Sequence, residues 1–395
     1  MPRALWLLVI GMAVNVTGSS FLWPLNTIYI HDHLGKSLSV AGIVLMLNSA
    51  ASVAGNLFGG NLFDKIGGYK SIIIGVSINV LSLIGLTIWH SWIPYAVFLT
   101  TVGIGSGIVF PSMYAMAGAV WKEGGRKAFN AIYVAQNIGV AIGSALGGMV
   151  ASYSFQLIFF ANAMMFVIFL IIALFGYRGI KTLSGKQTSI LQENSQIQSK
   201  TKWYALLTLC AGYLLCWVGY VQWMSTIAAY TQEINISLYQ YSLLWTINGA
   251  LIVIGQPVIS QVVKRFITSL KSQMIVGMVI FILSFLVASS AEQFIMFSAA
   301  MIILTIGEML VWPAVPTIAD QLAPKGKEGF YQGVVNSTAT GGRMLGPLLG
   351  GILVDSLGMS MLFTVMIGLL ILAIITTMIY DRKLKEAKRL TVHAS

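Results

Sequence analysis

Charged residues are scarce in this sequence: they make up 9% of its 395 residues, against roughly 25% in an average soluble domain. A chain with so few charges cannot cover a surface that faces water. It can cover a surface that faces lipid, where a charge near the centre of a membrane helix costs about 2.5–3.5 kcal/mol. The composition therefore excludes a soluble globular protein.

Cysteine is almost absent, and the two that occur, Cys210 and Cys216, lie in one apolar segment. Small buried side chains explain them without a redox or metal-binding role, so we predict no metal site. The sequence shows no phosphate-binding loop and no set of residues that could act as nucleophile and base. These absences argue against an enzyme and against a pump that hydrolyses ATP itself.

Long apolar segments fill most of the chain. A membrane-spanning helix needs about 20 apolar residues, whereas a strand of a membrane barrel has about 10 residues of alternating polarity. The length of the segments therefore favours an all-α integral membrane protein with about twelve transmembrane helices. The predicted spans cover residues 4–30, 38–62, 70–90, 93–119, 129–152, 155–176, 203–230, 240–263, 272–290, 294–319, 330–354 and 358–380.

The net charge of +11 is distributed unevenly between alternate connections of these spans. Every second connection, together with both ends of the chain, carries Lys and Arg residues, while the intervening connections carry only Lys36. Because positively charged connections stay in the cytoplasm, both termini are predicted to be cytoplasmic. The basic residues then report topology and can contact anionic membrane lipids, which argues against a nucleic-acid partner.

One polar segment divides the predicted spans into two groups of six. Residues 179–202 are rich in Ser, Gln and Lys and contain no aromatic residue, which is typical of a solvated linker. We therefore predict an N-terminal six-helix bundle at 1–178, a cytoplasmic linker at 179–202, and a C-terminal six-helix bundle with a basic tail at 203–395.

The two halves resemble each other. Four glycines of span five recur in span eleven at a constant offset (342 − 139 = 203), and a proline-bearing run of span four recurs in span ten (313 − 111 = 202). The pattern indicates an internal duplication. Parallel repeats of this kind occur in transporters that bind substrate between the halves, near the bilayer midplane. The glycines are Gly139, Gly143, Gly147 and Gly148, followed by Gly342, Gly346, Gly350 and Gly351.

The connection between spans two and three reads GNLFDKIGGYK over residues 60–70 and resembles the loop signature G-x-L-x-D-R/K-x-G-R/K-x-K/R of the major facilitator superfamily. Gly60 and Asp64 are one helical turn apart and share a face. A neighbouring helix can approach at the glycine and place its positive N-terminus against the carboxylate. The resemblance implies that this contact holds the cytoplasmic side shut. Gly68 departs from the signature, which has a basic residue there. The gating candidates are Gly60, Asp64, Lys65, Gly67 and Lys70.

Two further segments resemble motifs of the same family. Span five, with Gly139, Gly143, Gly147 and Gly148, is similar to the antiporter motif g-x-x-x-G-P-x-x-G-G, although Ser144 replaces its proline. General close packing of small residues is the alternative explanation. Residues 305–316 read TIGEMLVWPAVP and resemble the G-E-x-x-x-x-P segment of multidrug–proton antiporters in the twelve-helix efflux branch. The resemblance implies that Glu308 couples proton movement and binds cationic substrates. The second acid that some of these proteins carry in span five is absent here.

Glu308 and Arg343 are the two ionisable residues near the middle of predicted spans. Such residues are functional candidates by default. A carboxyl group between an apolar span and a guanidinium can take up and release a proton as water access alternates. A permanent structural ion pair is the alternative. With a single coupling acid, the exchange of one proton for one monovalent cation is electroneutral.

Aromatic and amide side chains are the candidates for the wall of the substrate cavity. Aromatic faces suit lipophilic cations, and 19 methionines suit an adaptable surface. Anchoring of aromatic residues at the membrane interface and ordinary packing of methionine are the alternatives. The candidates are Gln136, Asn137, Trp217, Tyr220, Trp223, Trp245, Asn248, Trp312 and Asn336.

Three functions stay open at this point. The first is a secondary active transporter of a bacterial plasma membrane, monomeric as the family implies. It would export lipophilic or cationic small molecules by alternating access, driven by the proton gradient and without a cofactor. The second is a carrier of the same fold for one dedicated substrate, such as a sugar, an amino-acid derivative, a peptide or a lipid-linked metabolite. Arg343 would suit an anionic one. The third is a membrane sensor or lipid-handling protein, against which the gating motif argues.

Overall fold

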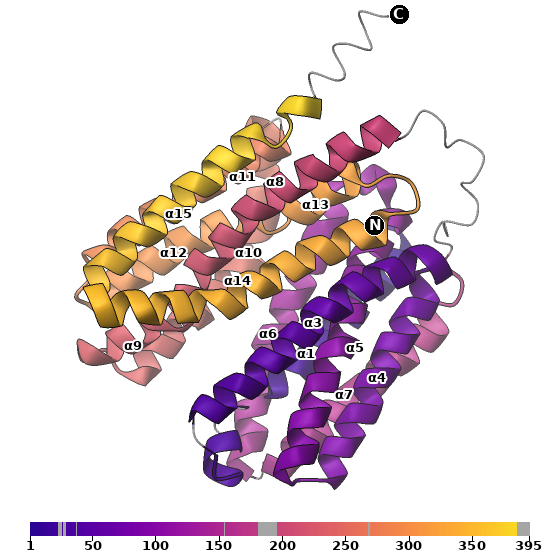
Figure 1. Ribbon diagram of the computed structural model, residues 1–395, viewed down its shortest axis with the longest axis horizontal. Coiled ribbons are helices and arrows are strands. Elements are labelled where there is room, and N and C mark those ends of the chain that lie inside the picture. Colours follow the sequence, from indigo (N-terminus) through magenta and orange to yellow (C-terminus); the bar gives the residue numbers. More distant parts are fainter. Residues whose placement is uncertain are drawn as a thin grey trace, which may run out of the picture. The chain divides into compact units, whose positions relative to one another are not determined.

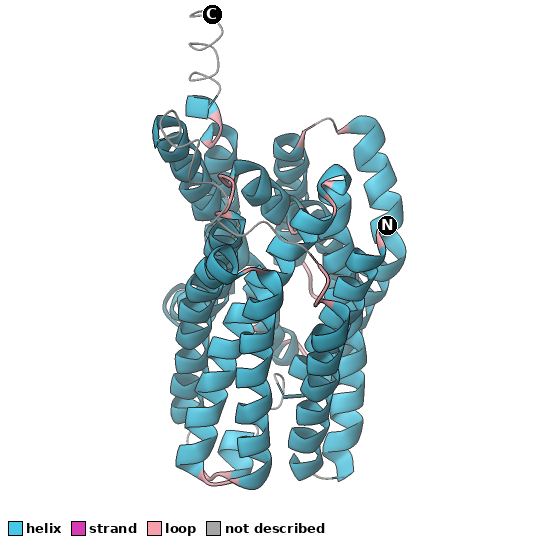
Figure 2. Cartoon of the chain, turned by 90° about the vertical axis from the view of Figure 1, so that its right-hand side faces the viewer, coloured by secondary structure: helices cyan, strands magenta, loops and turns pink. Residues whose placement is uncertain are grey.

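The computed structural model of the chain consists mainly of helices (Figures 1 and 2). It describes residues 1–395 except 23–25, 27–28, 37, 154, 181–195, 268 and 385–395. No β-strand occurs among the residues that the structure describes. The prediction of an all-α membrane fold is confirmed.

The helices follow one another along the chain with few interruptions. The N-terminal part contains α1 (Arg3–Leu22), the short π-helical turn η1 (Tyr29–His33), α3 (Leu38–Ile66), α4 (Gly68–Ile88), α5 (Trp92–Val120), η2 (Lys122–Gly124), α6 (Arg126–Tyr153) and α7 (Phe155–Gly176). The C-terminal part contains α8 (Gln196–Tyr220), η4 (Val221–Met224), α9 (Thr226–Glu233), α10 (Leu238–Phe266), α11 (Leu270–Ser289), α12 (Phe294–Val311), α13 (Ala314–Leu322), α14 (Glu328–Leu357) and α15 (Met359–Ile379).

Eleven helical segments of the described chain are long and apolar enough to cross a membrane. The remaining predicted span corresponds to α14, which has 30 residues and is therefore long enough. Glycines, hydroxyl residues and Arg343 make its sequence less apolar than that of the other spans. The chain is therefore a multi-pass membrane protein.

Two predicted spans are each built from two helices. The segment predicted at 203–230 is interrupted by η4, where α8 ends at Tyr220. The segment predicted at 294–319 is interrupted at Trp312 and Pro313, because proline has no N–H to continue the hydrogen-bond ladder of α12. Helix α8 also begins at Gln196, inside the predicted linker, of which residues 181–195 lie outside the described chain.

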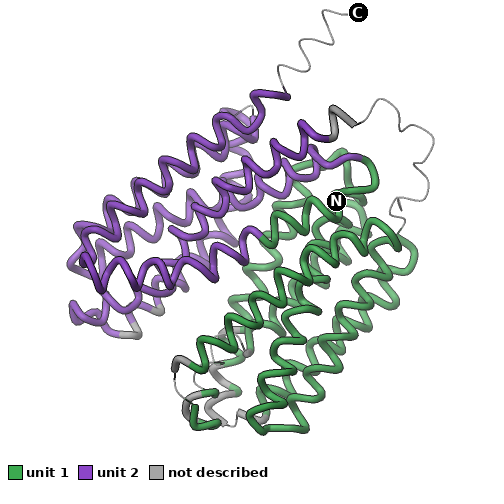
Figure 3. Tube along the Cα trace, in the orientation of Figure 1, with its two compact units in different colours: residues 1–188, 325–337 green, residues 189–324, 338–395 purple. Residues whose placement is uncertain are grey.

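The helices form two compact units, shown in different colours in Figure 3. Unit 1 comprises Met1–Thr188 and Lys325–Ser337, and unit 2 comprises Ser189–Pro324 and Thr338–Ser395. The first turns of α14 thus cluster with the N-terminal helices, although they follow the predicted linker by more than 100 residues. The remainder of α14 belongs to unit 2.

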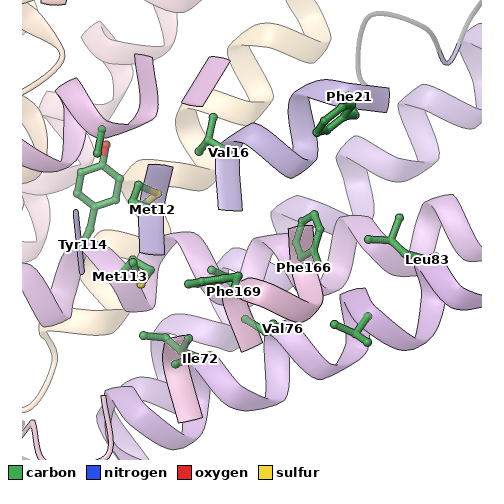
Figure 4. Packing of buried hydrophobic residues seen from close by; sticks show 14 of the residues in the cluster. Met12, Val16, Phe21, Ile72, Val76, Leu83, Met113, Tyr114, Phe166 and Phe169 are labelled. Atoms are coloured by element: carbon green, nitrogen blue, oxygen red, sulfur yellow. The ribbon is translucent and has the colours of Figure 1, made fainter. Parts of the chain in front are cut away.

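The core of unit 1 is apolar and densely filled. Helix α1 packs against α6 and α7, and α4 packs against α5 and α7. Met12 and Val16 of α1 meet Phe166 and Phe169 of α7 in this core (Figure 4), and Met12 and Phe169 are fully buried. Packing of large apolar side chains at this density supports the helices more than their intrinsic propensity does.

The same glycine contact occurs once in each unit. In unit 1, a Cβ on Gly75 of α4 would lie 2.9 Å from the carbonyl oxygen of Gly105 of α5. In unit 2, a Cβ on Gly277 of α11 would lie 3.0 Å from the carbonyl oxygen of Gly307 of α12. Both residues of the pair are shifted by the same interval (277 − 75 = 202 and 307 − 105 = 202). This matched pair of helix crossings supports the duplication inferred from the sequence.

Replacement of Gly307 by alanine should destabilise the protein, because the new methyl group would lie 2.7 Å from the Gly277 carbonyl oxygen and from the Phe281 ring. Overpacking of a filled core costs about 1–3 kcal/mol. Thermal unfolding in detergent should show a lower Tm for Gly307→Ala. Gly368→Ala is the control, since no atom lies within 4 Å of a Cβ at Gly368 in α15. Equal Tm values for the two variants would contradict the expectation.

Candidate functional site

A buried carboxyl group lies within unit 2. Glu308 of α12 is only 4% exposed. Its Oε2 accepts a hydrogen bond from the hydroxyl of Tyr220 at 3.1 Å and another from Nδ2 of Asn248 at 2.8 Å. Asn248 also donates to the hydroxyl of Thr305 at 2.9 Å. The carboxyl group therefore joins α12 to the end of α8 and to the middle of α10.

Gly307, the residue before Glu308, explains why the carboxyl group meets α8 and α10. Gly307 faces α11, where the absence of a side chain allows the close crossing at Gly277. Consecutive helical residues point about 100° apart, so Glu308 is directed away from α11. It meets α8 and α10 instead, through Tyr220 and Asn248. Within the Gly-Glu pair of the sequence motif, the glycine thus allows the helix crossing and the glutamate accepts two hydrogen bonds.

Six aromatic side chains of unit 2 contact one another, and one of them, Tyr220, donates to Glu308. We call them the aromatic cluster: Tyr213, Trp217, Tyr220, Trp245, Phe281 and Trp312. The rings of Trp217 and Trp312 are stacked, with centroids 4.6 Å apart and planes 7° apart. Tyr220 meets both edge-on, at 5.4 Å and 5.3 Å. Such geometries are favourable for aromatic pairs. Glu308 is joined to the cluster through the hydroxyl of Tyr220.

Arg343 of α14 lies over the ring of Trp217. Its guanidinium carbon is 4.8 Å from the centroid of the Trp217 ring, and Nη2 is 3.4 Å from the hydroxyl oxygen of Thr340. The side chain is exposed, unlike that of Glu308. Trp217 therefore contacts both the guanidinium and Tyr220, whose hydroxyl bonds to Glu308. An ion pair between Glu308 and Arg343 stays a hypothesis.

The predicted cavity residues fall into separate groups. Tyr220 and Asn248 of unit 2 hydrogen-bond to Glu308. Rings of the aromatic cluster that contact Tyr220 belong to Trp217, Trp245 and Trp312. Trp223, also in unit 2, is fully buried, and its ring centroid is 6.5 Å from that of Phe297. It therefore packs in the apolar core of the unit.

Three of the predicted cavity residues lie in unit 1. Oε1 of Gln136 accepts a hydrogen bond from the hydroxyl of Tyr114 at 3.0 Å. Asn137 and Asn336 each donate to a carbonyl group of their own helix, at 2.9 Å. A role of these three in substrate binding stays a prediction.

Sequence reasoning missed Gln222 and Tyr241, which hold the interruption after α8. Gln222 is fully buried, and its Nε2 donates to the carbonyl oxygens of Val218 and Gly346 at 2.8 Å. Tyr241 of α10 donates to the carbonyl oxygen of Trp223 at 2.7 Å and accepts from Nε1 of Trp245 at 2.9 Å. A glutamine inside an apolar segment was the available signal for the first, and none pointed to the second.

The antiporter-like glycines make room for neighbouring helices. A Cβ on Gly139 of α6 would lie 2.7 Å from the Ala13 carbonyl oxygen of α1. A Cβ on Gly143 would lie 2.4 Å from the Thr17 carbonyl oxygen of the same helix. A Cβ on Gly147 would lie 3.1 Å from Cα of Phe21. The surroundings of Gly148 lie outside the described residues. These contacts are close helix packing of the kind that small residues permit.

The gating candidates meet the first turn of α14 within unit 1. Asp64 is 5% exposed, and its two oxygens accept hydrogen bonds from the backbone N–H groups of Gly329 and Phe330, at 2.8 Å and 2.9 Å. Those N–H groups belong to the positive end of a helix dipole. A Cβ on Gly60 would lie 2.3 Å from the Gly329 carbonyl oxygen, so the crossing requires glycine.

The rest of the motif forms the turn between α3 and α4. Gly67 has a φ of 85°, which favours glycine. Lys65 and Lys70 are exposed. The departure at Gly68 has a steric reason, because a Cβ there would lie 2.7 Å from the Phe63 ring. A basic side chain at this position would require Phe63 to move.

Within the described residues, no group of three His, Cys, Asp or Glu side chains could hold a metal ion. Cys210 and Cys216 are buried as free thiols. The described contacts of Glu308 are hydrogen bonds from a tyrosine hydroxyl and an asparagine amide.

Comparison with known proteins agrees with this architecture. The sequence model of the family described as Major Facilitator Superfamily matches residues 8–340 and, in a second match, 225–393. The chain belongs to the major facilitator superfamily. It is 64% identical to the uncharacterized MFS-type transporter YttB of Bacillus subtilis (strain 168), over 100% of this chain and 99% of that protein. It is 24% identical to the multidrug resistance protein MdtH of Salmonella typhimurium, over 89% of this chain and 86% of that protein.

Solved structures show the same fold at low sequence identity. The crystal structure of the human organic anion transporter MFSD10 (TETRAN) has a TM-score of 0.77 and 16% identity, with 95% of this chain and 100% of that chain covered. A POT family transporter in complex with 5-aminolevulinic acid has a TM-score of 0.72 and 18% identity, covering 96% and 95%. The resemblance of this major facilitator protein to them concerns the fold alone.

Proposed function

We propose that this major facilitator protein exports lipophilic cations in exchange for protons. The observation that carries the proposal is the position of Glu308, a buried carboxyl group that is hydrogen-bonded to Tyr220 of the aromatic cluster. A carboxylate attracts a cation, and aromatic faces attract it further by about 0.5–2 kcal/mol per ring. Few other side-chain combinations favour a positive charge in an apolar environment.

Competition for one carboxyl group supplies the coupling. When Glu308 carries a proton, its charge is lost and a cation no longer has a counter-ion. When the proton leaves, the carboxylate can bind a cation. A site that holds either ligand but not both exchanges them as access alternates between the two sides of the membrane. Exchange of one proton for one monovalent cation is then electroneutral.

The contact of Asp64 with α14 supports alternating access. A carboxylate on two backbone N–H groups is a strong but reversible contact. We assign to it the role of a cytoplasmic latch that opens once in each cycle. With both termini cytoplasmic, as the charge distribution predicts, the latch lies at the inner face of the bacterial plasma membrane. Similarity to proteins named for multidrug resistance agrees with export.

Reconstitution of the wild-type protein tests the proposal. An imposed pH gradient should drive ethidium across proteoliposomes, and an ethidium gradient should in return move protons, as read by a trapped pH-sensitive dye. A membrane potential alone should leave the rate unchanged, because the exchange is electroneutral. Dye movement that follows the potential and ignores the pH gradient would refute the mechanism.

A second candidate function is a carrier dedicated to one anionic substrate. The observation that favours it is the exposed guanidinium of Arg343 in α14, because arginine suits carboxylates and phosphates. Under this alternative the wild-type protein would move no cationic dye at either polarity of the pH gradient. A screen of radiolabelled carboxylates and phosphate esters would then identify the substrate.

A further inference from the structure

Two asparagines occupy matching places in the two halves of the chain. Helices α3 and α10 begin and end at the same interval (238 − 38 = 200 and 266 − 66 = 200). That interval also separates Asn48 from Asn248 and Gly55 from Gly255 (248 − 48 = 200 and 255 − 55 = 200). Each asparagine donates from Nδ2 to a neighbouring helix of its own unit, which is α5 for Asn48 and α12 for Asn248.

The acceptors of the two amides differ in kind. Asn48 donates to the carbonyl oxygen of Leu99 at 2.6 Å, a backbone group whose charge never changes. Asn248 donates to the hydroxyl of Thr305 at 2.9 Å and to Oε2 of Glu308 at 2.8 Å. Because one bond from α10 to α12 ends on a carboxyl group, its strength depends on whether that group is charged.

The amide of Asn248 is held with its nitrogen toward α12. The hydroxyl of Thr305 donates to the carbonyl oxygen of Met301 at 2.7 Å, so it accepts the bond from Asn248. This bond uses one of the two hydrogens on Nδ2, and the other is directed to Glu308. Asn248 is buried, with 5% of its surface exposed. The donor is therefore committed to the carboxyl group.

Side chains separate α10 from α12 at a place where the backbones of α3 and α5 touch. A Cβ on Gly55 would lie 2.5 Å from the carbonyl oxygen of Ile104 of α5. A Cβ on Gly255 would first meet side-chain atoms of Met309, at 3.3 Å. Met309 stands where α5 has Gly107 (309 − 107 = 202). The α10–α12 crossing is therefore easier to loosen than its counterpart in unit 1.

We propose that Asn248 is the positioning residue that makes the exchange obligatory, so that no proton crosses without a returning cation. While Glu308 is charged and empty, the amide ties α10 to α12 and prevents the site from reorienting. A proton removes the charge, and a bound cation competes with the amide for it. Either occupant weakens the bond, since charge-assisted hydrogen bonds are roughly twice as strong as neutral ones. This inference rests on the proposed function and adds what keeps the carrier from returning empty.

Glu308 is the group at this bond whose charge can change at moderate pH. Helix α8 contributes the hydroxyl of Tyr220, on which Tyr241 of α10 and Arg343 of α14 also act electrostatically. Helix α11 contributes the apolar ring of Phe281, which contacts Tyr220. Tyrosine and arginine keep their protons below about pH 9. The strength of the bond therefore follows the occupancy of one carboxyl group.

Proteoliposomes test for the proton leak that loss of this bond predicts. They carry a pH gradient and no ethidium, with K⁺ and valinomycin to balance charge and a trapped pH-sensitive dye as the readout. Wild-type protein should move protons no faster than protein-free vesicles. Asn248→Ala should move them about tenfold faster or more, the change expected for one lost hydrogen bond to a charged group, because the empty site can then return. Asn248→Gln keeps an amide donor and should restore part of the coupling.

Asn48→Ala is the matched control, since it removes the bond to a backbone carbonyl at the matching place. It should show no leak, even where it lowers the Tm. Exchange without leak in Asn248→Ala would overturn the inference and leave the proposed exchange standing. An equal leak in Asn48→Ala would also overturn it, because the leak would then follow any loosened helix. Wild-type protein that moves no ethidium under a pH gradient would instead refute the proposed function itself.

A second measurement does not depend on the folding of Asn248→Ala. In a cysteine-free background, spin labels replace the exposed residues Val258 of α10 and Ala299 of α12, and double electron–electron resonance reports their distance. The distance should shift by about 1–2 Å between about pH 9 and about pH 5, the scale of a helix shift. Glu308→Gln should hold it at the low-pH value. Labels at Phe58 of α3 and Val97 of α5 are the control and should show no shift. A pH-independent distance between α10 and α12 would overturn the inference.

Discussion

Proteoliposomes that contain Glu308→Gln should show no ethidium transport driven by a pH gradient above the background of protein-free vesicles. Glutamine has nearly the same shape and its amide oxygen can still accept hydrogen bonds from Tyr220 and Asn248, so the local packing is retained. The amide can neither bind a proton nor offer a negative charge. Binding of the cation should weaken about tenfold to hundredfold, in line with the loss of a contact to a charged group worth roughly 1.5–3 kcal/mol.

Glu292→Gln provides the control for this variant. Glu292 is an exposed acid in the connection between α11 and α12, so it shares the chemistry of Glu308 without its burial. It should transport ethidium at the wild-type rate. If Glu308→Gln also retained gradient-driven transport, Glu308 would be a structural residue and the coupling would have to reside elsewhere.

The second large effect is expected at the cytoplasmic latch. Gly60→Ala should lower the turnover rate by tenfold or more, because the added methyl group would lie 2.3 Å from the Gly329 carbonyl oxygen and prevent the helix crossing. Asp64→Asn should have a similar effect. Its amide can accept from only one of the two backbone N–H groups and turns a donor toward the other. The initial transport rate, measured with saturating ethidium, reports the turnover.

Substrate affinity should stay near the wild-type value in both latch variants, because the Glu308 site lies in the other unit. Fluorescence titration with ethidium in detergent measures it. Gly42→Ala is the control in the same helix, since no atom lies within 4 Å of a Cβ at Gly42. Wild-type turnover in Gly60→Ala and Asp64→Asn would contradict a role of this contact in gating. Loss of affinity together with turnover would point to misfolding.

The helices themselves could be predicted from the sequence because lipid imposes a simple rule. A segment that crosses the membrane must be apolar for about 20 residues and must form all its backbone hydrogen bonds within itself, as a helix does. Composition and length are therefore enough to predict the membrane helices. The interruptions at Tyr220 and Trp312 do not follow from that rule. The second has a visible cause in Pro313. The first is held by Gln222, which donates to the carbonyl oxygen of Gly346, and by Tyr241, which donates to that of Trp223. Both partners are far from the donor in the sequence, so no local pattern reveals them.

The acid of the candidate site could be predicted from the sequence, but most of its surroundings could not. Glu308 stands out because a carboxyl group in an apolar span is rare. Its partners are ordinary aromatic and amide residues, so composition alone could not separate Trp217 and Trp312 from Trp223, which packs against Phe297. Helical periodicity was of little help, since a membrane helix with apolar residues on all sides has no marked polar face. Tertiary contacts decide which aromatic residues meet the acid.

The repeated glycine crossing shows how the two halves have diverged in composition. Next to Gly105, the first half has a hydrogen bond between Asn79 and Ser106 at 3.3 Å. At the same interval of 202 residues, the second half has Phe281 and Glu308 (281 − 79 = 202 and 308 − 106 = 202). The two positions of this neutral pair are thus occupied by an apolar ring and an acid in the second half. The shared glycine crossing therefore does not itself require an acid, because the first half forms the same crossing with a serine at that place.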